Sequence, residues 1–305
     1  MNNSSNKESR SEHNDNHPLK ITLVIVLVVM IAEVIGGIIS NSLALIGDAC
    51  HMLTDAFSLG LGIFAINIAR RPTTRTKTYG YYRAEIMAAL TNGTVLIMVA
   101  VYIFYEAFQR FSETSSVNAA TMLPIAGIGL VANISGILFL KGYSRNSLNI
   151  KAAYWHIIGD TLSSIGVIIA GIIILVTGWY IADPIVATII GFIILWGAIR
   201  IVREATDVLL ESVPKHIEMD KVIAAVSNIR GVKDLHDIHI WTITSGVYAI
   251  SAHLNIEDQT VSQSAEIVSA VNQLLATDFN ISHTTFQLEC ESCPTGLACN
   301  LCNLT

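Results

Sequence analysis

Charged residues are scarce in this chain of 305 residues. Asp, Glu, Lys and Arg make up 14% of it, whereas hydrophobic residues make up 52%, and the mean hydropathy is +0.55. Soluble domains contain about 25% charged residues, so this composition excludes an ordinary soluble protein and indicates a membrane protein. Acidic side chains number 24 and basic ones 18, and we expect no nucleic-acid partner.

A cleavable secretory signal is also missing. Residues 1–18 are polar and contain no short apolar core followed by a small-residue cleavage site. Their composition instead predicts a disordered tail that stays on the mature chain.

Long apolar runs stand where charge is missing. Six of them are long enough to cross a bilayer, which takes about 20 residues. They are residues 19–39, 43–69, 84–108, 119–140, 152–176 and 181–201. We therefore predict a multi-pass α-helical membrane protein with six transmembrane helices in residues 19–207. An even number of spans leaves both termini on the same side of the lipid bilayer.

Basic residues predict which side that is. They gather before the first span, between the second and third spans, and between the fourth and fifth, whereas the opposite loops hold only Arg110. By the positive-inside rule both termini are cytoplasmic. The short loop between the fourth and fifth spans and the missing signal favour a prokaryotic inner membrane.

Two matching pairs of a histidine and an aspartate lie inside the apolar runs. His51 and Asp55 are four residues apart in the second span, and His156 and Asp160 repeat that spacing in the fifth. On a helix this spacing places both side chains on one face. Ionisable groups in a membrane are costly unless they are paired or bind an ion. Two imidazole nitrogens and two carboxylate oxygens suit tetrahedral Zn²⁺, so we predict a metal site.

Two further acidic residues in the first two spans each have two interpretations. Glu33 carries protons, or it is bonded across a helix interface where Gly36 and Gly37 allow close packing. Asp48 lies on the same helix face as His51. It either accepts a hydrogen bond that orients His51 or caps the second helix near its outer end.

The composition changes after residue 207, and residues 208–289 predict a small folded domain. The pattern is helix 220–229, strand 232–243, strand 247–256, helix 262–277 and strand 284–289. The two central strands alternate apolar and polar residues, and Ser245 and Gly246 suit a hairpin turn. The order αββαβ predicts an α+β domain with its helices on one face of a sheet.

Four histidines lie on or beside these strands, namely His236, His239, His253 and His283. Each one alone is typical of a structural residue. As a group in a protein that handles metal, they are candidate regulatory ligands.

Residues 290–305 form a tail with two CxxC pairs. Their cysteines are Cys290, Cys293, Cys299 and Cys302. In a reducing cytoplasm such pairs bind a soft metal more often than they form disulfides. Redox-active or incidental thiols are the alternatives.

Four motifs resemble the cation diffusion facilitator family, and more narrowly its zinc-transporting branch. They are SLALIGDACHMLTD (residues 42–55), TYGYYRAEIMAALTNG (78–93), NIKAAYWHIIGDTLSSIGVII (149–169) and DIHIWTI (237–243). The resemblance covers nearly all of residues 19–289. It implies a homodimer in which a six-helix membrane domain carries a cytosolic ferredoxin-like metal-sensing domain.

The resemblance also implies roles for single residues. The four transport-site ligands of the family match His51, Asp55, His156 and Asp160. Its cytosolic ligands lie near His236, His253 and Glu289. Arg83 and Glu211 lie where the family places a charge pair between its membrane and cytosolic domains.

The resulting hypothesis is export of Zn²⁺ from the cytosol in exchange for protons, with Zn²⁺ also a regulatory ligand and with no organic cofactor. Cd²⁺ and Co²⁺ satisfy similar ligands. The alternatives are an intramembrane zinc metalloenzyme and a metal receptor without transport. No HExxH motif occurs, and four protein ligands leave no open position for an activating water. We therefore expect a transporter rather than an enzyme.

Overall fold

The computed structural model describes residues 24, 27–53, 68, 71, 73–113, 115–141 and 148–290, with only the backbone of residues 139–141 and 148–156. These residues belong to two units. The helical unit falls within Met1–Gly62 and Thr91–Ile201, and the mixed unit within Ile63–Leu90 and Val202–Thr305. The tail predicted at residues 1–18 lies outside the described residues.

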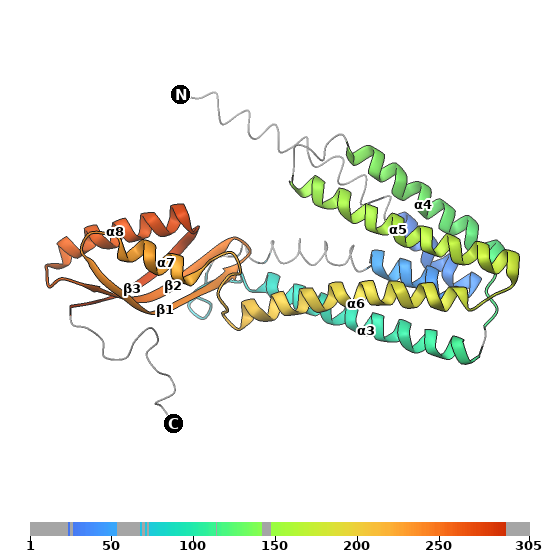
Figure 1. The fold of residues 1–305 in the computed structure, drawn as a ribbon, viewed down its shortest axis with the longest axis horizontal. Helices are drawn as coiled ribbons and strands as arrows, with labels where there is room; N and C mark the ends of the chain where they lie inside the picture. Colours follow the sequence, from blue (N-terminus) through green and yellow to red (C-terminus); the bar gives the residue numbers. More distant parts are fainter. Residues whose placement is uncertain are drawn as a thin grey trace. The chain divides into compact units, whose positions relative to one another are not determined.

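Long apolar helices build the helical unit (Figure 1). They are α3 (Ala84–Ser112), α4 (Ala119–Lys141), α5 (Leu148–Thr177) and α6 (Ala182–Leu209), of which α3 and α6 also extend into the mixed unit. Each contains a segment long and apolar enough to cross a membrane. Two shorter apolar helices, Leu27–Ser40 and Leu43–Leu53, fall in the first two predicted spans. The multi-helical membrane domain is thus confirmed, with four of its spans at full length among the described residues.

Many alanines lie among larger apolar residues inside the helical unit, and large apolar residues also cover its outside. Ala100, Ala187 and Ala198 are completely buried, whereas Phe108 and Trp196 are more than 70% exposed. Small residues let helix backbones approach one another, and an apolar outer surface is stable where lipid surrounds it. This packing is therefore that of a membrane protein, as the apolar composition predicted.

The helix Leu43–Leu53 is capped by a residue of another helix. Asp183, in the first turn of α6, accepts hydrogen bonds from Ser42 Oγ (2.5 Å), from the Leu43 amide (2.7 Å) and from the Ala44 amide (3.2 Å). The first amides of a helix have no partner within it, and a carboxylate oxygen satisfies them well. The start of this helix is therefore tied to the start of α6.

Arg110 extends this tie to α3. Its Nη1 lies 3.6 Å from Asp183 Oδ2 and donates to the Asn41 carbonyl at 2.6 Å, while its Nη2 donates to Asn41 Oδ1 at 3.0 Å. Asn41 has a left-handed φ of 55°, which lets the chain reverse between the first two helices. The buried Arg110 guanidinium on α3 thus contacts both α6 and the turn at Asn41 between the first two helices.

The mixed unit contains the predicted αββαβ domain. Its elements are α7 (Met219–Ser227), β1 (Val232–Thr244), β2 (Val247–Ile256), α8 (Val261–Asp278) and β3 (Ile281–Glu289). The sheet order is β1-β2-β3, with β1 antiparallel and β3 parallel to β2. Gly246 has a φ of 77°, which the predicted hairpin turn requires. The predicted element order is confirmed.

Both helices of this domain pack on one face of the sheet (Figure 1). A single core contains Val222 and Val226 of α7 together with Val271 and Leu275 of α8, all completely buried. Leu235, Ile240, Ile250 and Leu254 of the hairpin complete it. Neither α7 nor α8 covers the opposite face of the sheet.

The first turn of α3 belongs to the mixed unit and contacts the hairpin of the domain. Glu85 accepts hydrogen bonds from Thr244 Oγ1 at 2.6 Å and from Ser245 Oγ at 2.8 Å. Arg83 Nη2 lies 2.7 Å from Glu211 Oε1, at the end of α6. The charge pair that the family resemblance implied is therefore present.

Candidate metal sites

The structure brings together one residue from each of the two histidine and aspartate pairs. His51 Nε2, on the helix Leu43–Leu53, lies 3.8 Å from Asp160 Oδ1, on α5. Asp160 is buried and His51 is partly buried. Asp55 lies outside the described residues, as does the side chain of His156, whose backbone is in α5. Two of the four predicted ligands are therefore neighbours across two helices.

The distance between these two side chains is close to that of zinc ligands. Two ligands at about 2.0 to 2.1 Å from a tetrahedral ion lie about 3.3 Å apart. His51 Nε2 and Asp160 Oδ1 are 3.8 Å apart, so a small approach of the two helices would let both bind one ion.

Asp48 and Ser164 form a second contact between the same two helices. Ser164 Oγ donates to Asp48 Oδ2 at 3.1 Å, and Asn133 Nδ2 of α4 donates to Ser164 Oγ at 3.3 Å. All three residues are buried. The capping role considered for Asp48 is filled by Asp183 instead, so Asp48 serves as a buried acceptor deeper in the bundle.

Glu33 is completely buried against α4. A Cβ atom at Gly129 would overlap Glu33 Oε1, and one at Gly36 would overlap Ile125. Within the part of the chain that the structure describes, neither carboxylate oxygen of Glu33 has a hydrogen-bond partner. The expected close packing at glycines is present, but the expected bond across the interface is not found among these residues.

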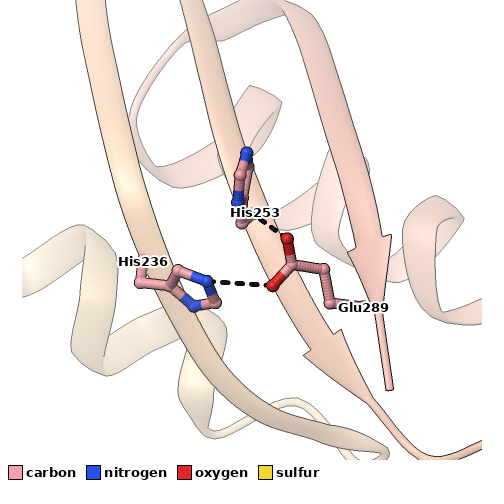
Figure 2. A group of neighbouring side chains, drawn as sticks. All are labelled: His236, His253 and Glu289. Carbon is pink, nitrogen blue, oxygen red and sulfur yellow. Dashed lines mark hydrogen bonds and ion pairs between the residues drawn. The ribbon is translucent and has the colours of Figure 1, made fainter. Parts of the chain in front are cut away.

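A second candidate site lies in the mixed unit, where His236, His253 and Glu289 point toward one another from three strands (Figure 2). Glu289 Oε2 lies 3.1 Å from His236 Nε2, and Glu289 Oε1 lies 2.9 Å from His253 Nδ1. Ligand atoms of all three residues lie within 4.8 Å of one another. Two imidazoles and a carboxylate are a common zinc ligand set, and three protein ligands leave a fourth position open.

The strands place this trio side by side. His236 on β1 pairs directly with His253 on β2, and Glu289 ends β3, one residue beyond the Leu254–Leu288 pair. Two acidic neighbours also approach the imidazoles. Asp234 Oδ2 lies 3.2 Å from His236 Nδ1, and Asp237 Oδ2 lies 3.4 Å from His253 Nε2. Carboxylates in such positions fix the orientation of metal-binding imidazoles.

The other predicted cytosolic residues lie elsewhere. His239 is exposed and contacts Asp237, and the His283 ring packs edge-on against Tyr79 with ring centroids 5.5 Å apart. Cys290 is an exposed free thiol. Cys293, Cys299 and Cys302 lie outside the described residues, so metal binding by the tail stays a prediction.

Two family descriptions match the chain and together cover most of it. "Cation efflux transmembrane domain" matches residues 19–210, and "Cation efflux protein, cytoplasmic domain" matches residues 214–291. The chain belongs to the cation efflux, or cation diffusion facilitator, family. This cation efflux protein is thus an integral multi-pass membrane protein with a cytoplasmic C-terminal domain.

Several relatives align with this cation efflux protein over most of their length. It is 40% identical over 261 residues to the "Cadmium, cobalt and zinc/H(+)-K(+) antiporter" of Bacillus subtilis, covering 85% of this chain and 84% of that protein. It is 39% identical over 287 residues to the "Metal cation efflux system protein CzcD" of Cupriavidus metallidurans, covering 92% and 90%. It is 34% identical over 268 residues to "Zinc transporter ZitB" of Shigella flexneri, covering 85% and 83%.

Membership of this family also decides between the classes of function considered. The matched domains and the relatives are cation efflux transporters. This cation efflux protein is therefore a transporter and not an intramembrane metalloenzyme or a receptor without transport.

The sequence did not single out Asp183 or Ser164, and it suggested Asp48 as an acceptor for His51 rather than for Ser164. Asp183 precedes Pro184 at the start of a span, a pattern that predicts a cap for its own helix, α6, rather than for the helix Leu43–Leu53. Asp48 lies three residues before His51, and Ser164 lies four residues after Asp160. These one-turn offsets place Asp48 and Ser164 on the ligand-bearing faces of their helices, but they do not predict that the two residues contact each other.

Proposed function

We propose that this protein exports Zn²⁺ from the cytosol in exchange for protons, and that His51, Asp55, His156 and Asp160 bind the transported ion. The observation that supports this site is the approach of His51 to Asp160 within the membrane domain, at 3.8 Å. Cd²⁺ and Co²⁺ are further candidate substrates, since the names of relatives include both metals and their ligand preferences are similar.

Exchange follows from the chemistry of the ligands. Imidazoles must be neutral and carboxylates ionised to bind zinc, so zinc and protons compete for the same groups. When the site faces the cytosol, zinc binds and protons leave. When it faces the opposite side, protonation favours release of zinc. Movement of the helices between the two states completes the cycle.

The membrane arrangement that we propose has six spans, with both termini in the cytoplasm of a prokaryotic cell. Residues 1–18 form a cytosolic tail, residues 19–207 the membrane domain, residues 208–289 a ferredoxin-like metal-sensing domain and residues 290–305 a cysteine-rich tail. The protein acts as a homodimer. The matched cytoplasmic domain, described under the short name ZT_dimer, supports that assembly.

The regulatory site that we propose consists of His236, His253 and Glu289, with Zn²⁺ as its ligand. Their mutual approach across three strands supports it. The four cysteines of the tail form a further site for a soft metal, a proposal that depends on their spacing alone.

Replacement of Asp160 tests the transport function. In proteoliposomes, we expect Asp160→Ala to reduce zinc flux to the level of protein-free liposomes, because a buried ligand is lost. The matched control is Asp220→Ala, an exposed aspartate in α7, which should transport like the wild type. Zinc flux at the wild-type rate in Asp160→Ala, with normal size-exclusion behaviour, would show that this site does not carry the ion.

A further inference from the structure

We propose that Ser164 is a positioning residue of the transport site. With Asp48 and Asn133 it holds the two halves of the site at a set spacing, and this spacing determines which ion fits. The inference rests on the proposed transport site, and it adds three residues that bind no metal themselves.

The hydrogen bonds run across three helices. Asn133 of α4 donates to Ser164 of α5 at 3.3 Å, and Ser164 donates to Asp48 of the helix Leu43–Leu53 at 3.1 Å. The exposed fractions are 3%, 1% and 1%. Hydrogen bonds between buried polar groups are strong away from water, and removing one partner leaves the other unsatisfied. The chain of bonds therefore resists separation of these helices.

The position of this contact relative to the ligands supports a role in transport. Asp48 precedes His51 by three residues and Ser164 follows Asp160 by four, so each lies about 4.5 to 6 Å along its helix from a proposed ligand. His51 and Asp160 form one contact between the two helices, and Asp48 and Ser164 form the next. A change in one contact consequently alters the spacing at the other.

The direction of the Ser164 hydroxyl distinguishes it from other hydroxyls in these helices. Ser135, Thr161, Thr177 and Thr188 each donate to the carbonyl four residues earlier in their own helix, at 2.6 to 2.7 Å. That local bond is the usual one for a hydroxyl inside a helix. Ser164 instead donates to another helix, which identifies its hydroxyl as an interhelical contact.

Spacing matters because ions differ in the distances they require. Zinc binds nitrogen and oxygen ligands at about 2.0 to 2.2 Å. A larger ion of similar ligand preference, such as Cd²⁺, needs the two halves farther apart. A bond that holds the helices close therefore favours zinc over cadmium.

The test compares Ser164→Ala with Ser164→Thr in proteoliposomes, using Zn²⁺ and Cd²⁺ separately. For Ser164→Ala we expect the KM for zinc to rise about tenfold and the KM for cadmium to change by less than about threefold, with the maximal rate per chain nearly unchanged. Ser164→Thr retains a hydroxyl and should restore the zinc-to-cadmium ratio. Ser135→Ala, whose hydroxyl bonds within α4, is the matched serine control.

The outcomes separate this inference from the transport assignment. If Asp160→Ala abolishes flux and Ser164→Ala behaves like Ser135→Ala, the positioning role is wrong and the transport site stands. If Asp160→Ala transports normally, the transport site itself is wrong. Should Ser164→Ala fail to fold, Asn133→Ala provides the measurement, and an unchanged zinc-to-cadmium ratio in that variant would overturn the positioning role.

Discussion

Glu289 ends β3 with its carboxylate between two imidazole rings, one oxygen near each. This arrangement suits two different interactions, ion pairing and metal binding. When the imidazoles are protonated, the carboxylate forms ion pairs with both. When they are neutral, the same atoms form an open set of zinc ligands. At the proposed regulatory site, as at the proposed transport site, zinc and protons would therefore compete for the same atoms.

Replacing Glu289 tests whether this carboxylate is a zinc ligand or only an ion-pair partner of the two imidazoles. We expect Glu289→Gln to weaken zinc binding by the cytoplasmic domain by at least about tenfold, because an amide oxygen is a poorer ligand than a carboxylate. Isothermal titration of the full-length chain measures this, with Asp160→Ala as the common background to disable the transport site.

His283→Ala is the matched control for that experiment, since His283 is also on β3 but packs against Tyr79. It should bind zinc like the background. Equal zinc affinity in Glu289→Gln and His283→Ala would contradict a regulatory site at this trio.

Helix packing in the membrane domain depends on where single side chains have room. In α4, a Cβ atom at Gly129 would overlap the carboxylate of Glu33, whereas one at Gly127 would have nothing within 4 Å. The two glycines are two residues apart in one helix. They therefore separate the effect of packing from that of helix propensity.

Gly129→Ala should lower the free energy of unfolding by about 1 to 3 kcal/mol, as overpacking does. Gly127→Ala should leave it unchanged or raise it by about 0.5 to 1 kcal/mol, because alanine favours the helix. Thermal unfolding of both variants in the same detergent measures the difference. Equal midpoints would show that Glu33 moves aside without cost.

The elements were predictable from the sequence, but some of their contacts were not. Alternation and the turn at Ser245 predicted β1 and β2, and a regular hairpin closed by that turn would pair His236 with Asn255. Two irregularities, between Thr242 and Thr244 and between His236 and His239, shift the register so that His236 pairs with His253. A slip of one residue reverses the face of every side chain, so sequence spacing alone does not predict that His236 lies opposite His253.

The same reasoning applies to the membrane helices. Spacing of four residues predicts that His51 shares a face with Asp55, and His156 with Asp160. Which residue of the opposite helix meets Asp48 depends on the rotation and offset of two helices. Packing against the rest of the bundle sets both, so the partner Ser164 was not predictable from periodicity.

At the scale of the whole molecule, the two proposed sites, one in each unit, would both bind zinc in competition with protons. The proposed exchange predicts that the apparent KM for zinc rises as the pH on the loading side falls from 8 to 6. The rise should be up to about tenfold per pH unit for each proton that zinc displaces. Initial zinc flux at fixed internal pH measures it.

Glu289→Gln should show the same pH dependence if the transport site causes it. A KM that stays constant over this range in both proteins would contradict exchange through imidazole and carboxylate ligands.

Asp183 gives the helix Leu43–Leu53 a fixed end. Ser42 and His51 are nine residues apart, about 13 Å along the helix. A tilt of the helix about its capped end therefore moves His51 in proportion to this distance. A tilt of about 2° moves His51 by about 0.5 Å, close to the difference between the observed 3.8 Å and the spacing of zinc ligands. A tilt of about 10° moves it by more than 2 Å. If His51 and Asp160 bind the ion as proposed, a tilt of about 2° would be enough to bind it and a tilt of about 10° enough to release it.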